Sequence, residues 1–438
     1  MGDPATHKKL GLSESLKYLL LTPQAAAYAA PMTTAVPRRI LPVIVLSQFA
    51  GTSLWFAVNA VLPDLQQAWA LPSTALASLT SAVQAGFVAG TLVFALLMLA
   101  DRFRPTRVFL ACCVLAALCN AAIALLDGQY RTLLALRFAV GFLLAGIYPV
   151  GMKIAASWYR EGLGAALGVL IGALVVGTAL PHGLRALVGT GAGLPAVGGL
   201  LPWQVVVLAV SLLATAGGVA TAWLVPSPQP GSGVPIRPRA LAAIWSEPRL
   251  RASVFGYFGH MWELYTLYAL LPVIIATRFA AQDVSLLAFW SIAAGALGCA
   301  GGGLLARRFG SAGVAQWQLA TSCLCCLAAP WLLVAPLPLF VAWLLLWGTT
   351  VAGDSPQFSA LTARNAPPAV IGSVLTFTNC IGFAISVASI ELFVRLAQVL
   401  PLDALLPFLA VGPVLGLWAL RPLVRALVAA PSSGRTPA

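Results

Sequence analysis

The stretch Leu99-Ala-Asp-Arg-Phe-Arg104 returns as Leu305-Ala-Arg-Arg-Phe-Gly310, 206 residues further along the chain. A second stretch, Gly141-Phe-Leu-Leu-Ala-Gly-Ile-Tyr-Pro149, returns as Gly348-Thr-Thr-Val-Ala-Gly-Asp-Ser-Pro356 at an offset of 207. Matches at nearly the same offset, in the same order, indicate an internal repeat.

A third pair extends the repeat toward the beginning of each copy. Trp55 and Trp262 are also separated by 207 residues. Any one match could arise by chance, but three matches in collinear order predict two homologous halves.

The composition predicts that both halves lie in a membrane. Charged residues make up only 8% of the 438 residues and hydrophobic residues make up 60%, whereas a soluble domain carries roughly 25% charged residues. The net charge of +13 does not indicate nucleic-acid binding, because the basic residues fall in short loops between apolar runs. The eight Cys lie within apolar segments with no zinc-type His or Cys spacing, so no metal site is expected.

Apolar runs separated by charged or Gly/Pro-rich breaks predict an all-α membrane protein with twelve transmembrane helices. The spans are expected at 40–62, 74–100, 107–127, 132–157, 163–187, 203–225, 251–276, 284–305, 312–335, 338–358, 369–393 and 404–428. They group into an N-terminal six-helix bundle (38–225) and a C-terminal six-helix bundle (251–428), joined by a cytoplasmic linker (226–250). The tails are residues 1–37 and 429–438.

The basic residues predict the orientation of the chain. Nineteen Lys and Arg fall on the side of the two tails and four on the opposite side, so both termini are expected in the cytoplasm. The protein is therefore expected to be a multi-pass protein of the cell (inner) membrane. Residues 1–37 read as a flexible tail, and Met32, just before Arg38-Arg39, is a second candidate start of translation.

Three motifs resemble those of the major facilitator superfamily over residues 38–428. The loop 100–107 is similar to the family's Gly-x-Leu-Ala-Asp-Arg-x-Gly-Arg-Arg signature, with Leu97 and Arg104 in place of its glycines. Arg137-x-x-x-Gly141 is similar to the second signature, Arg-x-x-x-Gly. Gly and Pro residues in the fifth span loosely resemble the signature of exporters, and the chain most resembles the cyanate and nitrate permease-like branch.

The resemblance implies two pseudo-symmetric six-helix bundles that rock about a central site, with helices 1, 4, 7 and 10 lining the cavity. The charge pattern agrees with it. Ionisable residues within a membrane are costly and usually face the bundle interior, and here they fall in helices 4, 7 and 10: Arg137, Lys153, His260, Glu263 and Asp354.

Helical spacing suggests which residues share a face. Arg137 and Tyr148 are eleven positions apart and nearly eclipsed, while Tyr257, His260 and Glu263 follow one another at steps of three. The residues expected to bind substrate are Arg137, Tyr148, Tyr257, His260, Gln48, Asn59 and Gln357. Arg137 as a brace between helices and His260 as an interior histidine remain alternatives.

Glu263 and Asp354 are the residues expected to couple transport to protons. Asp354, beside Pro356, has capping of a broken helix as its alternative role. The residues expected to gate the cytoplasmic side are Asp101, Arg102, Lys153 and Arg308, with Lys153 as a partner of Asp101 or a ligand group.

The sequence therefore predicts a secondary active transporter, coupled to protons, for a small polar or anionic solute. A drug or metabolite exporter with an apolar, aromatic cavity is the alternative, and a non-transporting receptor is a third. No phosphate-binding Gly-x-x-x-x-Gly-Lys-Ser/Thr loop is present, and the three His do not cluster as an enzyme would need. We expect no cofactor and a monomer whose partners are substrate, protons and lipid.

Overall fold

The computed structural model describes residues 36–126, 128–159, 163–189, 199–227 and 235–429. All helices described here belong to the unit that spans residues 39–438. Residues 1–35 of the N-terminal tail expected to be flexible, with Met32, and residues 430–438 of the expected C-terminal tail lie outside the described residues.

Long apolar helices make up the N-terminal half. Several begin with proline in the first turn, as Pro105 and Pro202 do, where the missing N–H is not needed. Within the described residues this half contains α3 (Ile40–Thr52), α4 (Ala57–Trp69), α5 (Ala75–Leu96), α6 (Leu99–Arg102), α7 (Pro105–Ala122), α8 (Tyr130–Leu144), α9 (Tyr148–Trp158), α10 (Leu163–Val188) and α11 (Pro202–Leu224).

The C-terminal half is built in the same way and is preceded by a short helix, α12, within the expected linker. Its described helices are α12 (Arg239–Ser246), α13 (Pro248–Ala276), α14 (Ala281–Ala293), α15 (Gly295–Leu327), α16 (Ala329–Leu332), α17 (Leu337–Gly353), α18 (Ser355–Asn365), α19 (Ile371–Leu396), α20 (Leu402–Leu405) and α21 (Val411–Ala429).

Eleven segments of the described residues are long and apolar enough to cross a membrane, where the sequence predicts twelve spans. The difference lies in Ala281–Leu327, which has 47 residues and contains the predicted span 284–305 and two thirds of the predicted span 312–335. A single span needs about 20 residues, and Gly310 divides the segment because its backbone is non-helical (φ 75°, ψ 152°). Glycine adopts this positive φ without a steric penalty. All twelve predicted spans therefore coincide with helical segments.

The outer surface is apolar, as a membrane protein requires. Large side chains such as Leu46, Leu212, Trp223 and Leu297 are exposed on different helices. A soluble protein rarely exposes so much apolar surface. Lipid is the environment that suits this surface.

The repeat read from the sequence reappears in the backbone. The fourth helix of the N-terminal half breaks between α8 and α9, and its counterpart in the C-terminal half breaks between α17 and α18. Both α9 and α18 have 11 residues, and their first residues, Tyr148 and Ser355, are 207 positions apart. The two halves thus share an irregularity as well as a helix order.

Two glycines of the repeat let neighbouring backbones approach closely. A Cβ on Gly141 would overlap the carbonyl oxygen of Val83 in α5. A Cβ on Gly348 would overlap the carbonyl oxygen of Ser291 in α14 in the same way. Small residues at such crossings allow membrane helices to pack without a side chain between them.

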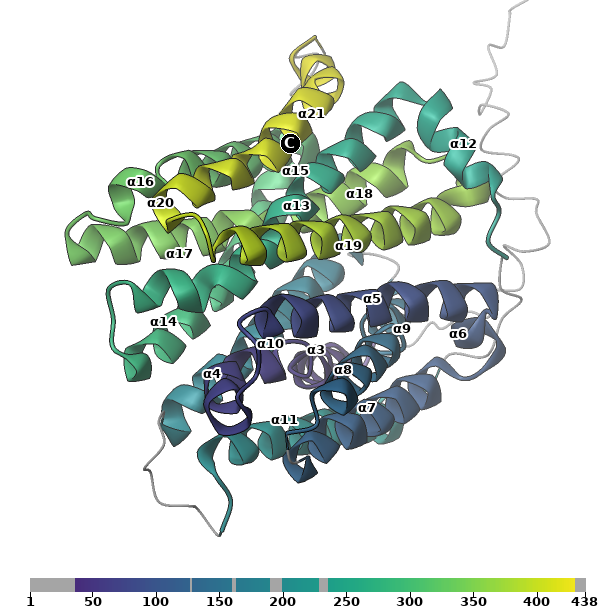
Figure 1. Ribbon diagram of the computed structural model, residues 1–438. Coiled ribbons are helices and arrows are strands. Elements are labelled where there is room, and N and C mark those ends of the chain that lie inside the picture. The colour runs from purple at the N-terminus through teal and green to yellow at the C-terminus, as the bar shows by residue number, and fades with distance from the viewer. Residues whose placement is uncertain (1–35, 127, 160–162, 190–198, 228–234, 430–438) are drawn as a thin grey trace, which may run out of the picture. The chain divides into compact units, whose positions relative to one another are not determined.

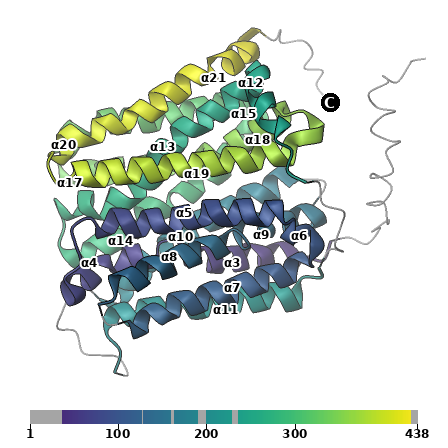
Figure 2. The same ribbon diagram turned by 45° about the vertical axis from the view of Figure 1, so that its right-hand side comes forward.

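The halves meet mainly at three pairs of helices, one of which joins α10 to α15. α5 packs against α19, and α10 packs against α14. Figures 1 and 2 both show α5 and α19 side by side along most of their length. The remaining faces of α9, α10, α13, α18 and α19 surround a small space between the halves.

Candidate functional site

A cavity of about 40 Å³ lies between the two halves. It has room for a few water molecules, since one water needs roughly 10–15 Å³ of such volume. Its polar lining residues come from α9, α10, α13, α18 and α19: Tyr148, Thr178, Tyr257, Tyr265, Tyr268, Ser355, Ser359 and Asn379. The rest of the lining is apolar, and none of the described lining residues carries a charge.

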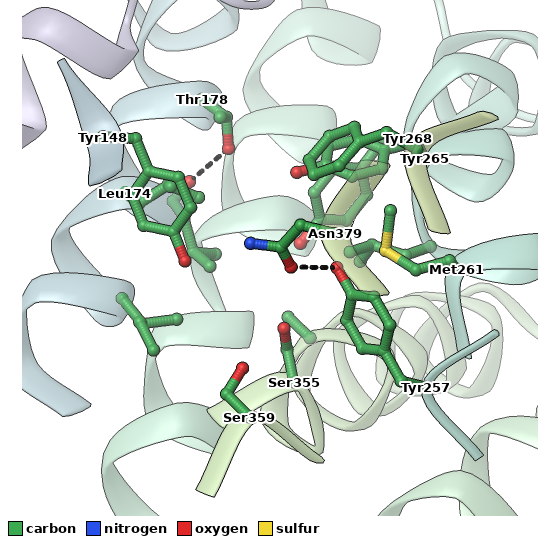
Figure 3. A pocket seen from close by; sticks show the side chains of 15 residues that line it. Tyr148, Leu174, Thr178, Tyr257, Met261, Tyr265, Tyr268, Ser355, Ser359 and Asn379 are labelled. Carbon is green, nitrogen blue, oxygen red and sulfur yellow. Dashed lines mark hydrogen bonds between the residues drawn. The ribbon is translucent and has the colours of Figure 1, made fainter. Parts of the chain in front are cut away.

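Only some of the hydroxyl groups in the cavity form hydrogen bonds with other described residues. The Tyr257 hydroxyl donates a hydrogen bond to Oδ1 of Asn379 (3.1 Å), as Figure 3 shows. Thr178 donates instead to the carbonyl of Val175. The Tyr268 hydroxyl has no hydrogen-bond partner among the described residues. Phenol and amide groups are therefore available to a bound molecule.

Six aromatic rings close the cavity on the side toward the C-terminal end of α13. Trp55 and Tyr265 stack across the interface with 5.8 Å between centroids, and Phe87 lies 4.5 Å from Phe383. The group, named here the aromatic cluster, consists of Trp55, Phe56 and Phe87 from the N-terminal half and Tyr265, Tyr268 and Phe383 from the C-terminal half. The cluster therefore joins the two halves beside the cavity.

His260 and Asp354 form a buried pair directly behind the cavity wall. Nδ1 of His260 lies 2.7 Å from Oδ1 of Asp354, and each side chain is 1% exposed. This contact is an ion pair when the imidazole is protonated. Tyr257, whose ring centroid is 5.7 Å from that of His260, and Ser355, next to Asp354, both line the cavity. The pair is thus one residue removed from the cavity.

Glu263 lies on a different side of α13 and is fully buried. Its carboxylate accepts hydrogen bonds from the Ser322 hydroxyl (2.5 Å), the Trp347 indole N–H (2.6 Å) and the Cys326 thiol (3.2 Å). These donors belong to α15 and α17, so every contact is within the C-terminal half. The structure does not bring Glu263 together with Tyr257 in the cavity.

Arg137 is also fully buried and lies outside the cavity lining. Its guanidinium donates to the carbonyl oxygen of Leu54 (3.1 Å) and to that of Trp55. These carbonyls belong to the break between α3 and α4, where the last turn of a helix has no partners of its own. A cation at a helix C-terminus is also favoured by the helix dipole. Arg137 makes no ion pair with any described acid.

The three amides predicted to bind substrate lie in separate places. Gln48 is fully buried beside Gly151, and neither polar atom of its amide has a partner among the described residues. Asn59 donates to the Thr80 hydroxyl (2.6 Å). Gln357 is buried in α18 and, like Gln48 and Asn59, is not among the residues that line the cavity.

Of the residues predicted to gate transport, Asp101 and Arg102 lie in the short helix α6, Lys153 lies in the middle of α9, and Arg308 lies two residues before Gly310. Lys153 forms an ion pair with Asp101 (2.5 Å) and donates to the carbonyl of Ala100 (2.6 Å). Arg102 and Arg308 are exposed, and the Arg308 guanidinium lies 5.2 Å from the ring centroid of Phe309. The Asp101–Lys153 pair ties α6 to α9 within the N-terminal half.

Several lining residues escaped the sequence reasoning. Tyr265, Tyr268, Asn379 and Ser359 all line the cavity. A helical pattern could have found the two tyrosines, because Tyr257, Met261, Tyr265 and Tyr268 follow one another at steps of four, four and three along α13. Asn379 has no comparable signal within its own helix.

Comparison with known proteins agrees with this architecture. The family model described as Major Facilitator Superfamily matches residues 44–389. Among curated protein sequences, none matches this chain. The crystal structure of the human organic anion transporter MFSD10 (TETRAN) is similar, with a TM-score of 0.65 and 18% identity over 87% of this chain and 99% of that one.

A second similar structure is that of a bacterial homolog to the human lysosomal transporter Spinster, in an inward-facing and unoccupied conformation. It matches with a TM-score of 0.62 and 15% identity over 89% of this chain and 94% of that one. At these identities the two structures support the fold alone. The family match, which assigns no branch, shows that this chain belongs to the Major Facilitator Superfamily and is a membrane transporter.

Proposed function

We propose that this protein is a secondary active transporter that binds a small organic solute in the cavity between its halves. The cavity would open alternately to the two sides of the membrane. The uncharged, tyrosine-lined cavity at the interface carries this proposal. Transporters built from repeats place their substrate site at this interface, near the middle of the bilayer. At about 40 Å³ the cavity is too small for an organic solute, so the described conformation corresponds to a nearly closed state.

The lining favours a solute with an apolar body and a few hydrogen-bonding groups. Tyr148, Tyr257, Tyr265 and Tyr268 supply ring faces and hydroxyl donors, and Asn379 supplies an amide. Hydroxyl and amide donors can bind a neutral polar group or a single carboxylate. The described lining contains no arginine that would bind a more highly charged anion. One of the similar structures, at 18% identity, is an organic anion transporter. We therefore propose a neutral or monoanionic organic solute.

We propose that protons drive the transport and that the His260–Asp354 pair binds the coupling proton. The pair is buried, yet it lies directly behind Tyr257 and Ser355, which line the cavity. Opening the cavity would bring water to the pair and closing would remove it, so its proton affinity would depend on the conformation. The Glu263 carboxylate accepts all its hydrogen bonds from the C-terminal half, and these contacts favour a structural role for that residue.

The substrate site can be tested by removing one hydroxyl group. Tyr257→Phe deletes the donor to Asn379 without changing the ring, and we expect the affinity for the solute to fall about fivefold to tenfold, since a lost hydrogen bond is worth about 1 kcal/mol. Purified protein would first be screened by thermal shift against neutral, anionic and cationic organic compounds, and the best compound titrated into each variant.

The matched control is Tyr130→Phe, which removes a hydroxyl from a half-buried tyrosine at the beginning of α8, away from the cavity. The two variants should differ clearly in affinity. If Tyr257→Phe and Tyr130→Phe both bind like the wild type, and Asn379→Ala does so too, the cavity is not the substrate site.

We propose that the ion pair Asp101–Lys153 holds the α5–α7 connection against α9 during the transport cycle. Arg102 and Arg308 are proposed to take part in gating at the same membrane surface. Asp101→Asn should slow transport severalfold while leaving solute affinity within about threefold, roughly 0.6 kcal/mol. Initial transport rates and binding would be measured on the same proteoliposomes. The reversed pair Asp101→Lys with Lys153→Asp should recover part of the rate, and a large loss of affinity would contradict the gating role.

Export is the second candidate, and the aromatic lining favours it over uptake of a strongly polar nutrient. With both tails in the cytoplasm of a bacterial-type inner membrane, as the basic residues predict, the direction can be read from oriented vesicles. Inside-out vesicles energised with an acidic lumen would accumulate the solute if the protein is an antiporting exporter. Right-side-out vesicles would accumulate it if the protein imports together with protons.

A further inference from the structure

A groove of about 990 Å³ opens on the outer surface of the C-terminal half, away from the central cavity. Its walls are α12 with the first half of α13 on one side and α21 on the other, and these helices are neighbours at one edge of Figures 1 and 2. Nothing in the transport proposal uses this groove.

One end of the groove is strongly basic. Arg251, near the beginning of α13, and Arg421 and Arg425, near the end of α21, all line it and are exposed. Neither Arg421 nor Arg425 forms an ion pair among the described residues, and Arg251 donates only to the carbonyl of Trp245 (2.9 Å). The described lining contains no acidic residue. This end is therefore complementary to an anion.

The rest of the groove is apolar. Its lining includes Phe255, Phe258, Leu415 and Trp418, and the last two are 59% and 65% exposed. At the inner end Gly259 and Gly412 bring the backbones of α13 and α21 together, since a Cβ on either residue would overlap the other helix. A continuous apolar trough thus leads from the arginines to a closed inner end.

The length of the trough matches one half of a bilayer. The lining of α21 extends from Val411 to Arg425, and that of α13 from Pro248 to Trp262. Fourteen steps of helix are about 21 Å, and one leaflet including its headgroups is about 20–22 Å thick. The arginines lie where the headgroups of that leaflet would be, and Trp245 is an exposed aromatic residue at the same level.

We propose that this groove binds one anionic phospholipid. The phosphate group would lie among Arg251, Arg421 and Arg425, and an acyl chain would follow the trough between α13 and α21. Basic sites between transmembrane helices recognise anionic headgroups, with about 1 kcal/mol for each Arg or Lys near the surface. The trough would supply the contact that distinguishes a lipid from a free phosphate ion.

The test is a native mass spectrometry titration of delipidated, full-length protein with dioleoyl phosphatidylglycerol and dioleoyl phosphatidylcholine. These lipids share their chains and differ in headgroup charge. We expect one phosphatidylglycerol to bind at least tenfold more tightly than phosphatidylcholine. Arg421→Gln with Arg425→Gln should weaken binding of phosphatidylglycerol about 25-fold, at about fivefold for each arginine. Binding of phosphatidylcholine, whose choline group offsets the charge of its phosphate, should weaken less.

The matched control is Arg104→Gln with Arg107→Gln, which removes two exposed arginines from the beginning of α7 and should change binding less than twofold. Ala419→Phe fills the trough without changing its charge and should weaken the binding of both lipids. Equal binding of the two lipids, or equal loss in the two double variants, would overturn the proposal. So would full displacement of phosphatidylglycerol by millimolar inorganic phosphate, since it would indicate a site for a free anion.

Discussion

Asp354→Asn is expected to abolish accumulation of solute driven by a pH gradient, while exchange of solute across a membrane without a gradient continues. Asparagine has nearly the shape of aspartate but cannot bind and release a proton, so each cycle would lose its coupling. The carboxylate is fully buried and its nearest ionisable neighbour is His260, at 2.7 Å. Accumulation and counterflow would be measured in proteoliposomes of the same preparation, and the accumulation ratio should fall to about 1.

Two other acids provide the comparison. Glu263→Gln places an amide N–H among three donors that now point at a carboxylate, so we expect less folded protein but normal coupling in the part that folds. Asp64→Asn removes an acid that pairs with Arg185 (3.0 Å) in the N-terminal half, and coupling should again be retained.

The opposite pattern would reverse the assignment. If Glu263→Gln loses accumulation with normal counterflow, and Asp354→Asn keeps the wild-type dependence on pH, then Glu263 is the coupling group and the His260–Asp354 pair serves to hold the break between α17 and α18. If both variants keep full accumulation driven by a pH gradient, neither Asp354 nor Glu263 binds the coupling proton.

The fold was accessible from the sequence because it depends on composition and on repetition. Twenty apolar residues in a row have few alternatives to a membrane helix, and the repeat around Gly141 and Gly348 fixed the correspondence of the halves. The boundary at Gly310 was likewise visible, because charged residues interrupt the apolar run there. These signals are local in the chain and need no knowledge of side-chain packing.

The side of α13 that faces the cavity was less accessible. Steps of three residues drift by about 60° each at 100° per residue, so Glu263 is about 120° round the helix from Tyr257. The cavity stripe instead follows Tyr257, Met261, Tyr265 and Tyr268, whose spacing keeps close to one direction. An ionisable residue stands out more in a membrane sequence than a tyrosine does. For that reason the sequence predicts a role for Glu263 and none for Tyr265 or Tyr268.

Arg137 and Tyr148 were also placed incorrectly by helical periodicity. They would share a face only if one continuous helix joined them. The chain is not helical between Leu144 and Tyr148, so the regular rotation is lost between the two residues. Only Tyr148 lines the cavity. Periodicity can place residues relative to each other only within one unbroken helix, and a Gly-Ile-Tyr-Pro run is a local warning of a break.

Arg137→Ala is expected to destabilise the protein by about 3–5 kcal/mol, because it leaves the carbonyls of Leu54 and Trp55 unpaired in the interior and opens a cavity there. Arg137→Lys should be intermediate, since one ammonium group cannot reproduce the two-pronged contact of a guanidinium. Thermal unfolding of detergent-purified protein would be monitored by the loss of monodispersity. The unfolding temperature should decrease in the order wild type, Arg137→Lys, Arg137→Ala. Arg131→Ala, an exposed arginine on the same helix α8, is the control and should unfold like the wild type.

This experiment also separates the two roles open to Arg137. A brace for the break in the first span would lower stability in both variants, while solute bound by the surviving folded protein would keep its wild-type affinity. A ligand for an anionic solute would do the reverse: Arg137→Lys would unfold normally and bind the solute much more weakly. The buried contacts to two carbonyls, and the absence of Arg137 from the cavity lining, favour the first outcome. The solute would then be recognised by hydroxyl and amide groups alone, which is why its net charge is expected to be no more than one.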